Sequence, residues 1–196
     1  GYHLTNIIIH SLMGLLVFYL FFALFSDYWL ALLGSILFCA HPIHTEAVAY
    51  ISGRAELLVS LFTLLTVISY LNYLKSNRNI AYLLSLFCFV LALLSKEAGF
   101  LILVPFFLVY LGIRAKTPKI NLSRHFISFA GILAIYAILR LTVLFPILFV
   151  RYKFSFLQDI LNFSLVLIEY LRILIFPHHL HLFRSIPVVS SNNSNI

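Results

Sequence analysis

Apolar runs of close to 20 residues recur along this chain and constrain its fold more than any other feature. The stretch 4–25 is one such run, and charged residues make up only 10% of the 196 residues. Soluble domains carry about 25% charged residues, whereas a helix needs about 20 predominantly apolar residues to cross a membrane. The runs do not alternate apolar with polar residues as barrel strands do. The sequence therefore predicts an all-α, polytopic transmembrane helical bundle.

The apolar runs predict about seven transmembrane spans. One of them, 29–40, reaches only about 18 Å at ~1.5 Å per residue, which is less than the ~30 Å hydrocarbon core. This helix is therefore either tilted into the wall of a cavity or followed by a segment that begins below the membrane surface. The predicted spans are residues 4–25, 29–40, 57–74, 80–94, 98–112, 126–145 and 160–176.

The basic residues predict the orientation of the bundle. The loops 75–79 and 113–124 fall on the same side and carry six of the thirteen Lys and Arg residues, so the positive-inside rule makes that side cytoplasmic. The stretch 41–58 and the turn 95–97 then face the non-cytoplasmic side. The net charge of +7 reflects the same positive-inside bias. Because the basic residues lie in short loops between apolar runs, we expect no binding to nucleic acid.

The stretch 41–58 is the main candidate for a functional site, because ionisable groups at membrane depth are costly unless they are paired or hydrated. His41, His44 and Glu46 lie within six residues of one another, which is compatible with a divalent metal site. The alternative is a polar turn that caps helices and pairs with a nearby cation. Pro42 favours the turn, because it takes the two histidines off a regular helical face. We expect no metal site, although a divalent metal stays possible.

Three cations extend this candidate site. Arg54 lies just before a predicted span, Lys96 lies between two spans, and Arg140 lies inside one. A lysine is a compact charge suited to phosphate, although an ordinary interfacial turn with a snorkelling lysine is an equal alternative. An arginine at membrane depth requires a partner or an anionic ligand.

Two further patterns predict contacts on helix faces. His3, Asn6 and His10 recur at helical spacing and share one face, which we expect to point into the bundle toward a ligand or another helix. Glu169 and Arg172 are three residues apart and are expected to pair along one helix.

The two cysteines, Cys39 and Cys88, lie in apolar runs. We expect both to be buried small residues, with no disulfide framework.

Four motifs, in order and in spacing, resemble one family. The motifs are YHLTNIIIHSLMGLL at 2–16, FCAHPIHTEAVAYISGRAELL at 38–58, LSKEAGFLILVP at 94–105 and YLRILIFPHHL at 170–180. They resemble the transmembrane and tetratricopeptide-repeat protein O-mannosyltransferases and their prokaryotic relatives, which belong to the GT-C superfamily of membrane glycosyltransferases. The resemblance covers essentially the whole chain, and its His-Pro-Ile-His-Thr-Glu-Ala-Val and Gly-Arg-Ala-Glu-Leu-Leu pieces are the most specific.

The resemblance implies an enzyme that transfers a sugar, mannose-like, from a polyprenyl-phosphate carrier to Ser or Thr of a protein, or to another acceptor such as a glycan, outside the cytoplasm. The membrane would be the endoplasmic reticulum or a bacterial plasma membrane, and membrane lipid would surround the chain. In this frame Lys96 and Arg54 hold the carrier phosphate, Arg140 assists, and the acids orient these cations or the acceptor. His41 and His44 hydrogen-bond sugar or phosphate. The implied substrate-binding residues are His41, His44, Glu46, Arg54, Glu56, Lys96, Glu97 and Arg140.

The chain departs from the family pattern at its start. The catalytic acid of GT-C enzymes usually follows the first span, and this chain begins at what resembles the second span. We therefore expect 1–185 to be a partial GT-C-like transmembrane domain that is inactive by itself, with the acid upstream of Gly1 and a polar tail at 186–196. The alternative function is a transporter or lipid flippase with a basic cavity. A polar cluster confined to one face favours the enzyme, because a transporter opens to both faces.

Overall fold

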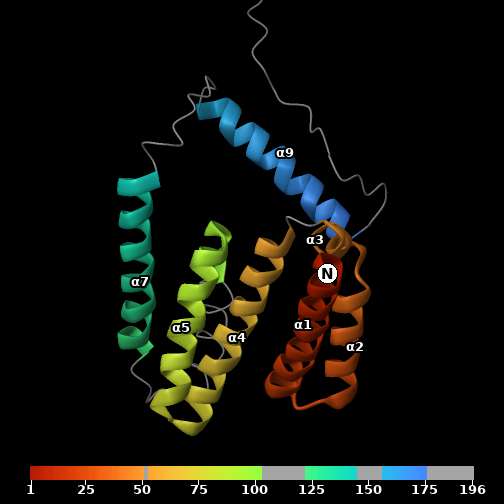
Figure 1. Cartoon of the computed structure of the whole chain (residues 1–196), viewed down its shortest axis with the longest axis vertical. Helices are drawn as coiled ribbons and strands as arrows, with labels where there is room; N and C mark the ends of the chain where they lie inside the picture. The colour runs from red at the N-terminus through yellow and green to blue at the C-terminus, as the bar shows by residue number, and fades with distance from the viewer. Residues whose placement is uncertain (51–52, 103–121, 145–155, 176–196) are drawn as a thin grey trace, which may run out of the picture. The chain divides into compact units, whose positions relative to one another are not determined.

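The computed structural model describes residues 1–50, 53–102, 122–144 and 156–175, and these residues form helices and short turns without strands. They divide into two compact units, Gly1–Pro146 and Ile147–Ile196. The elements of the first unit are α1 (Tyr2–Phe25), α2 (Tyr28–Ala40), the 3₁₀ turn η1 (Pro42–His44), α3 (Thr45–Ala49), α4 (Arg54–Ser76), α5 (Asn79–Ser95), the 3₁₀ segment η3 (Glu97–Ile102), α7 (Leu122–Leu139) and the π-helical turn η4 (Arg140–Leu144) (Figure 1). The second unit contains α9 (Phe156–Ile175).

The all-helical prediction is confirmed for the described residues, but the predicted number of seven spans is not. Among the described residues, three helices are long and apolar enough to cross a membrane: Tyr2–Phe25, Arg54–Ser76 and His125–Val143. A fourth span results if the bent pair of α2 and residues 42–49 counts as one. The helix α5 is apolar but shorter, with 17 residues. Most of the predicted span 98–112 lies outside the described residues.

Two tight turns make antiparallel helical hairpins of α1 with α2 and of α4 with α5 (Figure 1). Ser26 ends α1 in the left-handed conformation, with φ of 57°, and the backbone N–H of Leu30 donates to Asp27 Oδ1 at 3.0 Å. Asn77 ends α4 in the same left-handed conformation, with φ of 52°. Asparagine tolerates this conformation better than most residues, and the Asp27 carboxylate caps the exposed N–H groups of the next helix.

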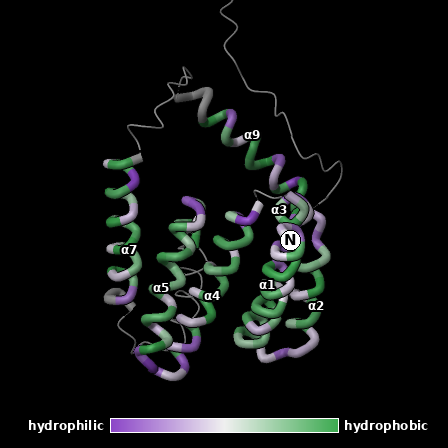
Figure 2. The backbone as a smooth tube through the Cα atoms, in the orientation of Figure 1, coloured by the Kyte–Doolittle hydropathy of each residue, from purple (hydrophilic) through white to green (hydrophobic). Residues whose placement is uncertain are grey.

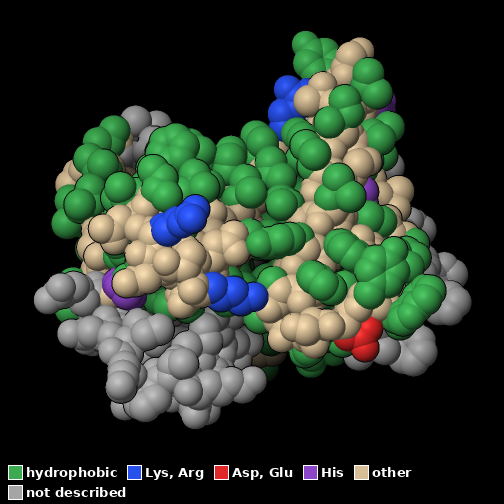
Figure 3. All heavy atoms as spheres, turned by 90° about the horizontal axis from the view of Figure 1, so that it is seen from below, with side chains coloured by type: hydrophobic (Ala, Val, Ile, Leu, Met, Phe, Trp, Pro, Cys, Tyr) green, Lys and Arg blue, Asp and Glu red, His purple; other side chains and the backbone are tan. Residues whose placement is uncertain are grey.

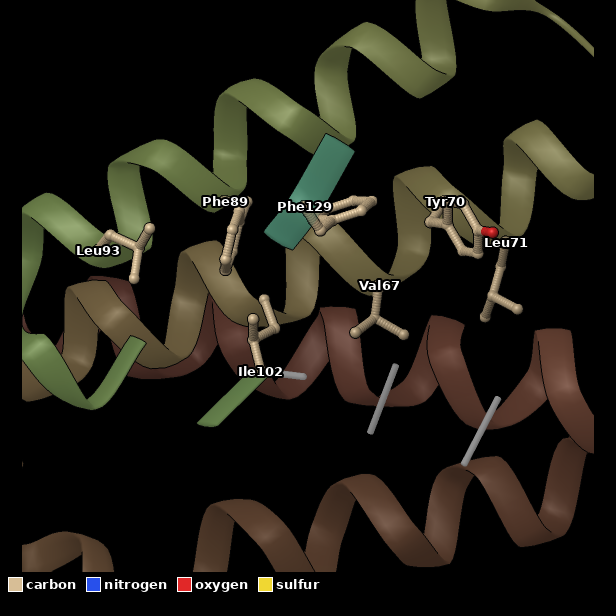
Figure 4. Close-up of a cluster of buried hydrophobic side chains, with 7 residues drawn as sticks. All are labelled: Val67, Tyr70, Leu71, Phe89, Leu93, Ile102 and Phe129. Carbon is tan, nitrogen blue, oxygen red and sulfur yellow. The ribbon is translucent and has the colours of Figure 1, made fainter. Parts of the chain in front are cut away.

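The helices α1, α2, α4 and α5 are mostly hydrophobic along their length and more hydrophilic near their ends, as Figure 2 shows. The main core of the first unit lies where α4, α5, η3 and α7 meet (Figure 4). Gly99 permits η3 to lie against α5, because a Cβ at this position would be 2.8 Å from the backbone of Ala92. The core residues are Val67, Tyr70, Leu71, Phe89, Leu93, Ile102 and Phe129.

The beginning of the described part of α7 is joined to the α4–α5 hairpin by a histidine between two tyrosines. The ring nitrogens of His125 lie 3.4 Å from the Tyr70 hydroxyl and 3.2 Å from the Tyr73 hydroxyl. The ring of Tyr82 lies 5.0 Å from that of His125. This contact was not predicted, because the tyrosines and the histidine are more than 50 residues apart.

The two ends of the first unit differ in character. The start of α1, the end of α2, the start of α4 and the end of α5 lie at one end, at the top of Figure 1, and we call this the polar end. The turns around Ser26 and Asn77 lie at the opposite end. Seen from below in Figure 3, the molecule shows mainly hydrophobic side chains, with few charged ones.

Candidate functional site

The motif 41–49 forms a sharp corner at the polar end. The chain bends by 45° between α2 and residues 42–49, with Pro42 in the first turn of η1. The His41 side chain caps this turn, because its Nδ1 accepts a hydrogen bond from the backbone N–H of Ile43 at 3.2 Å. The chain therefore turns sharply right after the short second helix, and this geometry assigns His41 a capping role.

The helix α1 holds this corner in place through two polar side chains. Asn6 is 1% exposed, and its Nδ2 donates to the carbonyl oxygens of Val48 at 3.3 Å and Tyr50 at 3.2 Å. His10 Nε2 donates to the carbonyl oxygen of Cys39 at 3.3 Å. The prediction that this face of α1 points into the bundle is therefore confirmed for Asn6 and His10, and its partner is the corner itself.

A pocket of about 380 Å³ opens between α1 and the corner, and we call it the histidine pocket. Its imidazoles come from both sides, and the rings of His10 and His44 lie 5.2 Å apart. The prediction that Cys39 is buried is wrong: its thiol is free and exposed and lines this pocket, whereas the free thiol of Cys88 is buried. The pocket is lined by His3, Ile7, His10, Cys39, Ala40, His41, His44, Thr45, Val48 and Ala49.

The histidine pocket does not have the geometry of a metal centre. Within the described ranges, no group of three or more His, Cys, Asp or Glu side chains is arranged to hold a metal ion. Two ring nitrogens already have protein partners, His41 Nδ1 and His10 Nε2. Glu46, the oxygen ligand that a metal site here would need, is exposed in the first turn of α3 and is not among the described residues that line the pocket.

An ion pair joins the end of α5 to the start of α4. Lys96 Nζ lies 2.6 Å from Glu56 Oε1, and the two side chains are 38% and 53% exposed. Lys96 was predicted to lie near the stretch 41–58, and its partner is the last acid of that stretch. Since both groups are partly hydrated, the pair fixes geometry more than it stabilises the fold.

A second ion pair joins η3 to the end of α7. Arg140 Nη2 lies 2.9 Å from Glu97 Oε1, and Arg140 Nη1 donates to the Tyr136 hydroxyl at 3.0 Å. A hydrogen bond from its own backbone, followed by the hydrogen bond from Arg140, lowers the pKa of Glu97. Arg140 therefore has the partner that an arginine within a predicted span requires.

Arg54 differs from these two cations. Its guanidinium carbon lies 5.4 Å from the centre of the Tyr2 ring, a cation–π contact between α4 and α1. Its Nε is buried without a hydrogen-bond partner, and no carboxylate among the described residues lies within 4.0 Å of its side chain. Arg54 is thus the cation of the candidate site whose charge no described acid neutralises.

The predicted site residues therefore separate into contacts on different elements. His41 and His44 lie at the pocket, Glu56 pairs with Lys96, and Glu97 pairs with Arg140. In the second unit, the predicted pair of Glu169 and Arg172 is present at 3.7 Å.

Tyr2 and Tyr136, which contact Arg54 and Arg140, were not predicted. A helical plot reveals Tyr136, four residues before Arg140, whereas Tyr2 is brought to Arg54 by tertiary packing alone.

Comparison with known proteins identifies the relatives of this chain. A protein O-mannosyl-transferase of Caenorhabditis elegans is 42% identical over 103 residues, which are 50% of this chain and 14% of the relative. The protein O-mannosyl-transferases TMTC4 and TMTC3 of Homo sapiens are 36% identical over 123 residues and 39% identical over 102 residues. These matches cover 53% and 50% of this chain and 17% and 11% of the two human proteins.

No protein-family model matches the chain, and no solved structure matches it. The matched part spans well under a fifth of the length of the relatives named above. Over about half of its length, this chain is similar to the TMTC family of protein O-mannosyl-transferases, which confirms the family resemblance predicted from its motifs.

Proposed function

We propose that this chain forms the donor side of a membrane glycosyltransferase that moves a mannose-like sugar from a polyprenyl-phosphate carrier to Ser or Thr of a protein on the non-cytoplasmic face. The relatives support this proposal because they are named protein O-mannosyl-transferases. The apolar helices support a membrane location, either the endoplasmic reticulum or a bacterial plasma membrane.

One observation carries the proposal beyond the names of the relatives. The polar end gathers three cations and a pocket lined by histidine rings at the ends of apolar helices. A polyprenyl phosphate has an apolar chain and an anionic head, so it matches apolar helix surfaces that end in basic groups. Fixed cations also stabilise the negative charge that develops on a phosphate leaving group.

Arg54 is the residue that we assign to the carrier phosphate. It has a charge without a described carboxylate partner and an unsatisfied Nε, and the Tyr2 ring holds its guanidinium from one side. A guanidinium presents several N–H donors to phosphate oxygens. Lys96 and Arg140 take supporting roles at the polar end, because their ion pairs with Glu56 and Glu97 largely neutralise their charges and fix their positions.

The remaining predicted residues take roles on the acceptor and sugar sides. Glu46 is exposed on α3 and is available to orient an acceptor. His41 and His44 line the histidine pocket beside it. None of these residues is assigned as the catalytic acid.

The test compares arginine variants in the full-length protein, with mannose transfer from a polyprenyl-phosphate donor to an acceptor peptide as the readout. Arg54→Gln removes one charge-assisted contact, which is worth about 1.5–3 kcal/mol, so kcat/KM is expected to fall on the order of tenfold or more. Arg54→Lys should keep part of the activity, because the charge remains without the planar donors.

The matched control is Arg78→Gln, an exposed arginine that precedes α5 at the opposite end of the bundle. Its kcat/KM should equal that of the unmodified protein. Equal transfer by Arg54→Gln and Arg78→Gln would remove Arg54 from the donor site. Absence of transfer from any polyprenyl-phosphate sugar by the unmodified protein would overturn the proposed function.

A further inference from the structure

The histidine pocket contains a ring nitrogen without a partner. His10 Nε2 lies 3.3 Å from the carbonyl oxygen of Cys39, and a carbonyl only accepts hydrogen bonds, so this nitrogen carries a proton. In the neutral ring the other nitrogen, Nδ1, is then an acceptor. Nδ1 is buried, and no donor from the described residues reaches it. Buried acceptors are normally satisfied, so a ligand with a donor would gain free energy here.

The chemistry of the pocket restricts what that donor is. A phosphate ester oxygen only accepts and does not satisfy His10 Nδ1. An ammonium group would donate, but among the described residues no acidic side chain lines the pocket to neutralise it. A hydroxyl group donates without charge. Pocket volume adds a size limit, because 380 Å³ is near the lower end of the ~300–1,000 Å³ range of small-molecule pockets.

The apolar part of the lining agrees with a sugar ring. Ile7, Val48 and Ala49 line the same pocket as the imidazoles, and a monosaccharide presents C–H groups as well as hydroxyls. Resting on the proposed function, we propose that the histidine pocket binds the sugar ring of the donor, with a sugar hydroxyl donating to His10 Nδ1. Because that atom is buried, binding requires the neighbouring side chains to move while His10 keeps its contact with the Cys39 carbonyl.

This assignment separates the two parts of the donor. Arg54 takes the phosphate, and the histidine pocket takes the sugar. His10 is a binding residue that the sequence motif 41–49 does not include, because it lies on α1 and reaches the corner through the Cys39 carbonyl.

The thiol of Cys39 reports on occupancy without any catalytic step. It is exposed and lines the pocket, whereas Cys88 is buried. The experiment measures the alkylation rate of Cys39 by iodoacetamide in the full-length protein in detergent, read by mass spectrometry of its peptide. Three probes are compared: a short-chain polyprenyl-phosphate mannose, the same lipid phosphate without sugar, and methyl mannoside.

The expected result is that both mannose-bearing probes slow the alkylation of Cys39, the lipid-linked one at lower concentration, while the bare lipid phosphate leaves the rate unchanged. Protection by the bare lipid phosphate equal to that of the mannose lipid would overturn the proposal, because the pocket would then bind lipid or phosphate. Protection by neither mannose probe would also overturn it.

Two variants test the assignment to Nδ1. His10→Gln retains a donor at the Nε2 position for the Cys39 carbonyl and removes the acceptor at the Nδ1 position. Its concentration for half-maximal protection by the mannose probes should rise about tenfold, as expected for the loss of one hydrogen bond. His10→Asn places an amide oxygen at the Nδ1 position and should recover part of the protection.

The outcomes distinguish this proposal from the proposed function. Normal mannose transfer together with unchanged protection in His10→Gln would overturn the sugar pocket and leave the function in place. Protection by methyl mannoside that His10→Gln abolishes, without transfer from any lipid donor, would support the pocket and overturn the function. The unreacted Cys88 peptide shows in each case that the protein is folded, because Cys88 is 5% exposed.

Discussion

Replacing Asn6 by alanine is expected to release the corner that forms one wall of the histidine pocket. The Asn6 amide is 1% exposed and donates to the Val48 and Tyr50 carbonyls. At about 1 kcal/mol for each hydrogen bond, the loss is about 2 kcal/mol. Since ~1.4 kcal/mol corresponds to a factor of ten, the opening equilibrium of the corner should increase on the order of 30-fold.

Hydrogen exchange measured by mass spectrometry tests this directly, because it reports local opening free energies. Peptides that cover residues 45–50 should exchange on the order of 30-fold faster in Asn6→Ala, while peptides from α5 should be unchanged. Asn6→Asp should have a larger effect, because an ionised carboxylate is acceptor-only and would face two carbonyl oxygens. The near-isosteric shape of aspartate makes this variant a test of hydrogen bonding apart from packing.

The control is Asn72→Ala, which removes a single exposed hydrogen bond of 3.0 Å to the Tyr19 hydroxyl, also between α1 and α4. It should leave exchange at 45–50 unchanged. If Asn6→Ala and the unmodified protein exchange equally at this segment, the two hydrogen bonds do not hold the corner and the reasoning fails.

Three further predictions concern the same end of the bundle. Gly53→Ala should destabilise the protein, because the new Cβ would lie 2.8 Å from the backbone Cα of Ala47 in α3. Gly131→Ala should stabilise α7 by about 0.5–1 kcal/mol, because nothing lies within 4 Å of its new Cβ. Both effects can be measured by thermal unfolding, with thiol labelling as the readout of the unfolded fraction. The pKa of the Glu97 carboxyl is lowered in the folded state. The stability that it contributes is therefore present above its ordinary pKa and is lost as the pH falls through the lowered value. In Glu97→Gln, this decrease in melting temperature at acid pH should be absent. Lys96→Glu and Glu56→Lys should each destabilise the protein, and the double variant should recover most of the stability that either one removes. The coupling energy should be no more than about 1 kcal/mol, because the pair is partly exposed. Effects of the two single variants that simply add in the double variant would contradict the ion pair.

The sequence by itself determined where most of the described helices lie, although not the number of spans. Long apolar runs leave the backbone polar groups no partner other than the helix itself, and the turn at Ser26 and Asp27 has the residue types that end one helix and begin the next. The pairing of Glu169 with Arg172 followed from helical spacing. The apolar runs that mark the candidate spans are also continuous in the chain, and the family resemblance came from four motifs in order along it.

Only the tertiary structure decided which polar groups meet. Glu56 and Lys96 are 40 residues apart, and Glu97 and Arg140 are 43 residues apart, so sequence spacing cannot pair them. His41 caps a turn through its own neighbour, whereas Asn6 and His10 reach the corner from another helix. Helix packing brings such groups into contact, and the spacing that predicts a face does not specify what that face contacts. The sequence therefore predicted a set of candidate residues. Their division into two ion pairs, an arginine without a described carboxylate partner and a histidine pocket came from the fold.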